Sequence, residues 1–234
     1  QLLNVVGDDA EFASGGFGVN QGFAIDIHEN FIVVGMGTSA DGRIRTLMRS
    51  PDGAWMPRPI LSSNSDEFGS ALALSEEYLL VGAPGKAVGQ KRNAGGLTVY
   101  RDNPENENWT SAGFISSPAQ NSVRLGSSVA IVGDTLVAGA PGGRGFVAFH
   151  EPNDVGGWSR GQVLDGRDFG THEFGASLTV SGDTLFVGTG NGSSSPPEVM
   201  VFERDEAGLW TRIQTFGRGD RDEGFGAILA AHGD

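Results

Sequence analysis

The sequence predicts an all-β fold, a β-propeller whose blades are four-stranded antiparallel sheets, and three observations lead to this prediction. The chain has 38 glycines among 234 residues, where an average protein has about 7%, so many tight turns are expected. A pattern of landmark residues returns every 47 to 57 residues, close to the period of propeller blades. Apolar residues fall into short runs bounded by turn-forming residues, which is typical of strands.

Each repeat opens with a pair whose second residue is glycine, and another glycine lies 14 residues after the opening residue. The opening pairs are Gln21-Gly22, Phe68-Gly69, Leu125-Gly126, Phe174-Gly175 and, for a fifth unit, Phe225-Gly226. The second glycines are Gly35, Gly82, Gly139 and Gly188. The predicted organisation is a single propeller, or propeller fragment, over 1–234, with full repeats at 21–67, 68–124, 125–173 and 174–224 and part repeats at 1–20 and 225–234.

The first strand of a unit alternates in polarity, as in residues 70–74, which indicates a half-buried strand. Turn sequences such as Gly133-Asp134 follow it. The second strand is a continuous apolar run, and such a run indicates burial on both faces. These runs are residues 78–81, 135–138 and 184–187.

The third strand ends in an apolar landmark, and the fourth begins at a tryptophan 8 or 9 residues later. The landmarks are Leu47, Tyr100, Phe149 and Phe202, and the tryptophans are Trp55, Trp109, Trp158 and Trp210. We expect these side chains to fill the space between neighbouring blades. The alternative is a series of exposed rings that binds a ligand. No window shows helical periodicity.

The repeat resembles the FG-GAP repeat, which is named for Phe-Gly followed by Gly-Ala-Pro. The resemblance rests on Phe68-Gly69 with Gly82-Ala83-Pro84, and on Leu125-Gly126 with Gly139-Ala140-Pro141. It covers 21–234, with departures at Gln21 and in the fourth unit, which lacks the proline. It implies a propeller, commonly of seven blades, that serves extracellular adhesion or recognition, as in secreted and cell-surface proteins and, more distantly, integrin α-subunits.

Integrin-like repeats also carry an Asp-rich calcium loop after Gly-Ala-Pro. The corresponding loops 85–95, 142–145 and 191–197 hold no acidic residue, and calcium needs clustered oxygen ligands. We therefore expect no cofactor and no integrin-type calcium site. Asp220, Asp222 and Glu223 form a weak candidate for a cation site, with a solvated acidic loop as the alternative.

Charge and composition exclude several classes of partner. The formal net charge of −13 makes nucleic acids and anionic membranes poor partners. The absence of cysteine excludes disulfides and thiolate metal sites. No run of 18 apolar residues occurs, so no membrane insertion is expected. The sequence starts without Met and stops one strand into a fifth unit, and we expect the natural protein to be longer, or else its two ends to complete one short blade.

Two surface segments are candidate recognition sites, and two asparagines are candidate glycosylation sites. Arg218-Gly219-Asp220 is the tripeptide that many integrins bind, or else a solvated turn. Lys86, Lys91 and Arg92 form a basic loop that could dock an acidic partner, or else a surface insertion. Asn108 and Asn191 begin N-glycosylation sequons.

Catalytic motifs are not found, and the best acid–base set is Asp165, Asp168, His172 and Glu173. We therefore expect a non-enzyme, an interaction or scaffold module of an extracellular or cell-surface assembly, with other proteins as partners. One alternative is a carbohydrate-binding propeller, which would need exposed aromatic rings and would bind glycans. The other is the propeller part of a larger secreted enzyme, which would need carboxylates that converge on the central channel.

Overall fold

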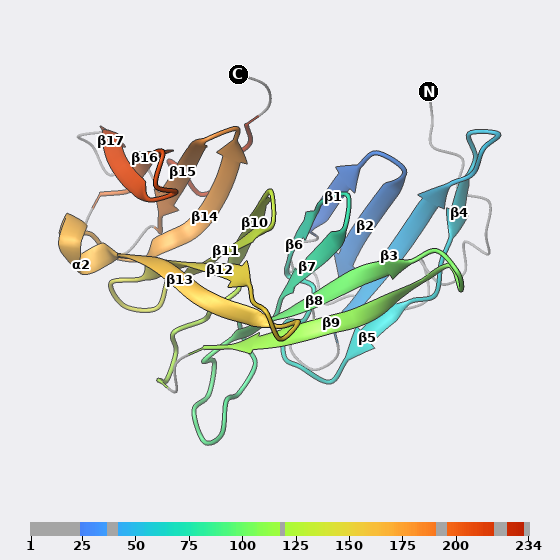
Figure 1. The fold of residues 1–234 in the computed structure, drawn as a ribbon. Coiled ribbons are helices and arrows are strands. Elements are labelled where there is room, and N and C mark those ends of the chain that lie inside the picture. Colours follow the sequence, from blue (N-terminus) through green and yellow to red (C-terminus); the bar gives the residue numbers. More distant parts are fainter. Residues whose placement is uncertain (1–23, 37–41, 118–119, 191–195, 218–223, 232–234) are drawn as a thin grey trace.

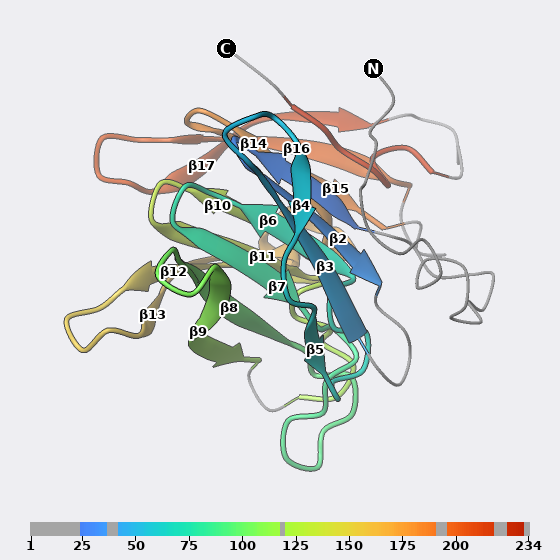
Figure 2. The same cartoon turned by 90° about the vertical axis from the view of Figure 1, so that its right-hand side faces the viewer.

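The structure, a computed structural model, describes residues 24–36, 42–117, 120–190, 196–217 and 224–231. These residues form four antiparallel sheets, each built in chain order from one repeat (Figure 1). The first strands of consecutive sheets contact one another, so they lie innermost and the later strands lie outside them (Figure 1). Figure 2 shows the same four sheets turned by 90°. The predicted all-β fold of four-stranded blades is confirmed.

The strand bounds follow the repeat closely. Blade 1 contains β1 (Ile25–His28), β2 (Phe31–Met36), β3 (Gly42–Arg49), and β4 (Trp55–Pro57) with β5 (Leu61–Ser63), which both pair with β3. Blade 2 contains β6 (Ala71–Leu74), β7 (Tyr78–Gly82), β8 (Gly96–Asn103) and β9 (Asn108–Ser116). Blade 3 contains β10 (Ser128–Val132), β11 (Thr135–Ala140), β12 (Phe146–Pro152) and β13 (Trp158–Asp165). Blade 4 contains β14 (Phe174–Ser181), β15 (Thr184–Thr189), β16 (Glu198–Arg204) and β17 (Trp210–Gly217).

One helical turn, α2 (Gly166–Phe169), departs from the strand prediction. The side chain of Asp165 accepts a hydrogen bond from the backbone N–H of Arg167, and Gly170 ends the turn in the left-handed conformation. Because α2 is only four residues long, no periodicity could reveal it. Within the described ranges, the structure has no helix long and apolar enough to cross a membrane.

Neighbouring blades pack through aromatic rings, as the sequence predicts. Trp109 contacts Phe31 of blade 1 with ring centroids 5.2 Å apart, and Trp158 contacts Tyr78 of blade 2 at 5.3 Å. Trp210 stacks on Phe149 of blade 3 at 5.7 Å. Trp109 and Trp210 are each only 4% exposed. These two rings belong to the core, so the alternative of an exposed aromatic series is wrong for them.

The apolar landmark predicted for the third strand of blade 3, Phe149, is wrong by one position. Strand pairing places Tyr100 opposite Leu79 and Phe202 opposite Leu185. Leu79 and Leu185 both lie 11 residues after the opening residue of their unit. The equivalent residue of blade 3, Leu136, pairs with His150 and not with Phe149. The third strand of blade 3 therefore carries a histidine, 5% exposed, where the other blades carry an apolar or aromatic side chain.

Side-chain hydroxyls help to join consecutive blades near the axis. Ser128 Oγ donates a hydrogen bond to the carbonyl oxygen of Gly175 at 2.7 Å, and Ser177 Oγ donates to that of Gly226 at 2.5 Å. Both serines lie three residues after the opening residue of their own blade, and both acceptors are opening glycines of the next unit. The equivalent residue of blade 2 is Ala71, which has no hydroxyl to donate.

Candidate functional site

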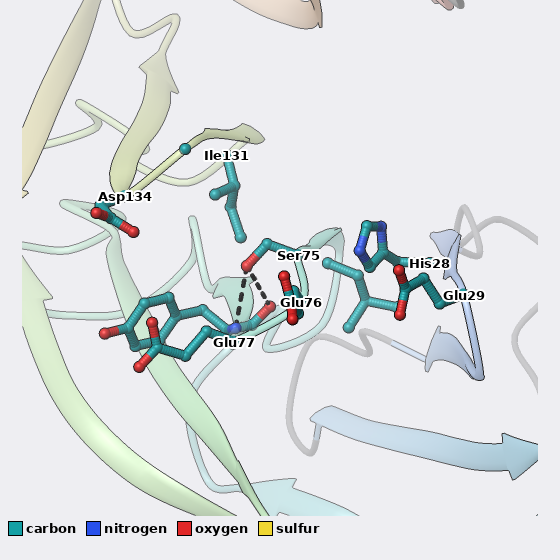
Figure 3. Close-up of a pocket in the computed structure, with 10 residues that line it drawn as sticks. His28, Glu29, Ser75, Glu76, Glu77, Ile131 and Asp134 are labelled. Atoms are coloured by element: carbon teal, nitrogen blue, oxygen red, sulfur yellow. Dashed lines mark hydrogen bonds between the residues drawn. The ribbon is translucent and has the colours of Figure 1, made fainter.

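A cavity of about 830 Å³ lies where the turns between the first and second strands of blades 1, 2 and 3 meet. We call it the axial cavity. Its lining residues are His28, Glu29, Leu74, Ser75, Glu76, Glu77, Tyr78, Ile131, Gly133 and Asp134. In Figure 3, His28 and Glu29 lie at one end, Asp134 lies at the other, and Ser75 lies between them. The propeller thus brings together residues that are more than 100 positions apart in the sequence.

The lining of the axial cavity is strongly acidic. Glu29, Glu76, Glu77 and Asp134 supply four carboxyl groups, and His28 is the one basic side chain among the lining residues. Arg101 pairs with Glu77 at 2.7 Å from the rim, where both side chains are about half exposed. The field inside the cavity therefore disfavours anions and favours neutral or cationic ligands.

The turn of blade 2 is held in place by local hydrogen bonds. Ser75 N–H donates to the carbonyl oxygen of Tyr78 at 2.9 Å, and Tyr78 N–H donates to Ser75 Oγ at 3.0 Å. Glu76 and Glu77 occupy the two positions between them and project outward from this closed turn. Their placement in the cavity therefore follows from the turn geometry.

Asp26 lies behind His28 on the same face of β1 and joins blade 1 to blade 2. Its carboxylate accepts the N–H of Leu74 in β6 at 2.7 Å and the N–H of Ile27 at 2.8 Å. Burial raises the pKa of Asp26, while these two hydrogen bonds and the charge of His28 act in the opposite direction. Asp26 therefore joins the strand that carries His28 to blade 2.

Tyr78 separates the axial cavity from a second cavity of about 450 Å³ between the outer parts of blades 2 and 3. Its hydroxyl accepts a hydrogen bond from the guanidinium of Arg101, whose charged group also lies 5.0 Å from the tyrosine ring centre. We call this second space the seam cavity. Its lining residues are Tyr78, Arg101, Ser111, Ala112, Pro152, Asn153, Gly156, Gly157 and Trp158.

The structure does not gather the sequence-predicted site residues into one place. Arg218, Gly219, Asp220, Asp222, Glu223 and Asn191 lie outside the described residues. Asn108 begins β9, is half-buried and accepts the N–H of Trp109. Within the described part of the chain, no group of three or more His, Asp or Glu side chains is arranged to hold a metal ion.

The basic loop is less free than its sequence suggests. Lys86 places its ammonium 3.9 Å from the ring centre of Phe114, and partial burial lowers the pKa of Lys86. The N–H of Arg92 donates to the side chain of Asn121, and the backbone of Lys91 is hydrogen-bonded in both directions to Val88. Two of the three predicted docking residues are thus part of internal packing, and Arg92 stays exposed.

The residues of the axial cavity were missed by sequence reasoning, although a signal exists. In each unit, an acidic residue lies eight or nine positions after the opening residue. The residues are Glu29, Glu76, Glu77, Asp134 and Asp183. Equivalent turns of a propeller meet around one end of its axis, so this recurrence could have predicted the acidic site.

Comparison with known proteins supports the fold. No protein-family model matches the chain, and no curated protein matches it significantly. A solved protein of Lactobacillus plantarum is similar, with a TM-score of 0.56 at 14% identity over 85% of this chain. This chain spans only 55% of that protein's length. A candidate 6-phosphogluconolactonase of Bacteroides uniformis gives a TM-score of 0.51 at 11% identity, over 84% of this chain and 71% of that one.

These findings correct four expectations. The FG-GAP resemblance is not supported beyond its implication of a propeller fold, and the adhesion role that it implied has no support either. The expectation of a non-catalytic scaffold module is wrong, and so is the expectation that the chain is not an enzyme, because the solved propellers that share its fold include a candidate lactonase. At 11% identity, the likeness itself establishes the fold, and the lactonase name belongs to the neighbour.

Proposed function

We propose that this chain is the propeller of a hydrolase that opens a neutral, sugar-derived lactone bound in the axial cavity. The observation that carries the proposal is the position of His28 in a cavity of about 830 Å³, which is lined by four carboxyl groups and is large enough for a sugar ring. The fold it shares with a candidate 6-phosphogluconolactonase supports the choice of reaction. This is the enzyme alternative of the sequence analysis, and an extracellular location stays a prediction.

The proposed reaction needs a base, which His28 can supply. Imidazole is the side chain whose ordinary pKa lies nearest neutrality, so it can accept a proton from water at pH 7. The water oxygen attacks the lactone carbonyl carbon, and the ring ester C–O bond breaks. The proton on His28 then passes to the departing ring oxygen, so that lactone and water give one hydroxy acid. Asp26 stabilises the imidazolium while it exists.

The acidic lining gives this site a selectivity that the neighbour's name does not suggest. A phosphate group on the substrate would meet Glu29, Glu76 and Asp134 and would be repelled. A neutral lactone meets no such barrier, and the carboxylate formed by hydrolysis is expelled. We therefore propose an unphosphorylated sugar lactone as substrate, and hydroxyl-rich ligands as the class that the carboxylates can hydrogen-bond.

The test is a pH-stat assay of glucono-lactone hydrolysis, measured against the spontaneous rate. Wild-type protein is expected to accelerate hydrolysis, and His28→Gln is expected to lose 100-fold or more, the order of a lost general base. His172→Gln is the matched control, because His172 lies outside the axial cavity. Binding of the lactone without acceleration would support the carbohydrate-binding alternative, and no acceleration by the wild type would overturn the hydrolase proposal.

A further inference from the structure

One equivalent position, in the fourth strand of a blade or directly after it, carries a side chain that reaches the next blade in two of the three described seams. In blade 1 this residue is Arg58, whose N–H donates to the carbonyl oxygen of Thr46. In blade 3 it is Gln162, which lies opposite Phe149 in the bulge between Val163 and Arg160. In blade 2 it is Gly113, which pairs with Val99. The strand register makes the three positions equivalent. In each blade, the second glycine of the repeat pairs with a residue of the third strand, and the residue two positions later faces the position in question. These third-strand residues are Thr46, Val99 and Phe149.

Two of these residues act as clamps on the next blade. Arg58 Nε donates to the carbonyl oxygen of Glu107 at 2.5 Å, and its terminal nitrogen donates to Asp102 at 2.6 Å. Gln162 donates to the carbonyl oxygen of Trp210 and accepts its N–H, both at 2.8 Å. The carboxamide of Gln162 thus binds both backbone polar groups of the tryptophan that begins the last strand of blade 4.

Blade 2 has no clamp, and the seam cavity lies beside the position where the clamp is missing. Gly113 offers no side chain, and a β-carbon there would stand 3.3 Å from Cδ1 of the Trp158 ring. Trp158 is the blade 3 equivalent of Trp210, because it pairs with Pro152 as Trp210 pairs with Arg204.

The seam cavity contains polar groups that a carboxamide can hydrogen-bond. The backbone N–H and C=O of Trp158 stand where those of Trp210 are bound by Gln162. Ser111 and Arg101 supply further polar groups. The half-buried Trp158 lines the cavity with an aromatic ring of the kind that sugar rings pack on, whereas the ring of Tyr78 is covered by Trp158 and Arg101. We propose that the seam cavity binds an amide-bearing sugar, an N-acetylated amino sugar, whose acetamido group takes the place of the missing glutamine side chain.

The proposal is independent of the hydrolase proposal, because it concerns a different cavity and needs no turnover. The probe is N-acetylglucosamine, and glucose, which lacks the acetamido group, is the matched control. The readout is the backbone amide resonance of Trp158 in ¹⁵N-labelled protein. N-acetylglucosamine is expected to shift this resonance saturably, and glucose is not. A Trp158 amide that ignores N-acetylglucosamine, or that responds equally to glucose, would overturn the proposal.

Three variants sharpen the test. Gly113→Gln supplies the missing clamp and is expected to weaken binding at least tenfold. Because Gly113 has a φ of 153°, which strains other residues, Ser111→Tyr fills the same cavity from a position without this demand and must give the same loss. Gln162→Ala removes the clamp of blade 3 and is expected to make the Trp210 amide respond to N-acetylglucosamine as well. Unchanged binding in both filling variants would place the ligand elsewhere and overturn the site.

Discussion

The carbonyl oxygen of Gly126 lies 2.1 Å from the place that a β-carbon on Gly82 would occupy. Gly82 ends the second strand of blade 2 and Gly126 opens blade 3, so the contact joins two blades. The same contact recurs between Gly139 and Gly175 at 2.1 Å and between Gly188 and Gly226 at 2.3 Å. The glycine 14 residues after each opening residue is therefore required by the approach of the next blade's backbone.

Gly82→Ala is expected to lower the free energy of unfolding by about 3 kcal/mol, because the backbone of blade 3 must move away from the new methyl group. Gly161→Ala is the control, since its β-carbon would meet no atom closer than 3.5 Å. Urea unfolding of both variants measures the difference. Equal stability of the two would show that the blades do not approach as closely as described.

Arg58→Met is expected to cost about 3 kcal/mol, because it leaves the partly buried carboxylate of Asp102 without its partner. It also removes the guanidinium that lies 5.7 Å from the Trp109 ring centre. Arg167→Met, at an exposed arginine 3.9 Å from Asp165, should change stability by less than about 0.5 kcal/mol. Thermal unfolding followed by tryptophan fluorescence compares the two, and a similar small effect of both would contradict the clamp.

His150 predicts a pH-dependent stability. Burial, with a smaller contribution from the charge of Arg160, lowers the pKa of His150 from 6.5 to about 4, and its Nδ1 has no hydrogen-bond partner. Between these two values the unfolded chain binds more protons, so stability is full above pH 6.5 and falls as the pH drops toward 4, by up to about 3 kcal/mol. Leu47 occupies the equivalent position of blade 1. His150→Leu introduces the same side chain in blade 3 and is expected to abolish this part of the pH dependence.

The measurement for His150 is urea unfolding of wild type and His150→Leu at pH 7 and pH 5. The free energy of unfolding of His150→Leu, relative to that of the wild type, should be higher at pH 5 than at pH 7. His172→Leu serves as the control, because His172 is not buried in the interface between blades. A difference in the free energy of unfolding that is the same at both pH values would mean that His150 titrates normally in the folded state.

Glu76→Gln should change substrate selection more than turnover, if the proposed hydrolase site is correct. Removing one carboxylate weakens the repulsion of phosphate, so KM for a phosphorylated lactone should fall about threefold while KM for glucono-lactone barely moves. The effect should shrink in high salt, because ions screen exposed charges. A change in KM that is the same for both substrates would refute the electrostatic account. Glu105→Gln, at an exposed residue outside the cavity, is the control.

The sequence was sufficient for the fold because the repeat is carried by backbone requirements. Gly82 and its equivalents cannot vary, and the alternation of residues 70–74 follows from one buried face. Blade 3 shows where such reasoning stops. Phe149 is the apolar residue at the end of its run, but hydrogen bonding across the hairpin places His150 in the equivalent position, and loop lengths that differ between units hide this register.

The candidate site was harder to predict for a related reason. His28, Glu76 and Asp134 each read as an ordinary turn residue, and only the closure of several turns around one axis brings them together. The seam cavity depends on the absence of a side chain at Gly113. An absence becomes visible only after strand pairing shows that Arg58 and Gln162 occupy the same position in other blades.

The seam between blades 2 and 3 has a mechanical consequence. It lacks the serine hydrogen bond near the axis, because residue 71 is alanine, and it lacks the clamp at the rim, because residue 113 is glycine. The ring contact of Trp158 with Tyr78 resists separation but not sliding, since it is not directional in the way a hydrogen bond is. The backbone still joins the two blades, because Leu125 N–H donates a hydrogen bond to the carbonyl oxygen of Ala94 at 3.1 Å. What the seam lacks is side-chain bonding, and a ligand that bridged the seam cavity would supply directional contacts at its outer end.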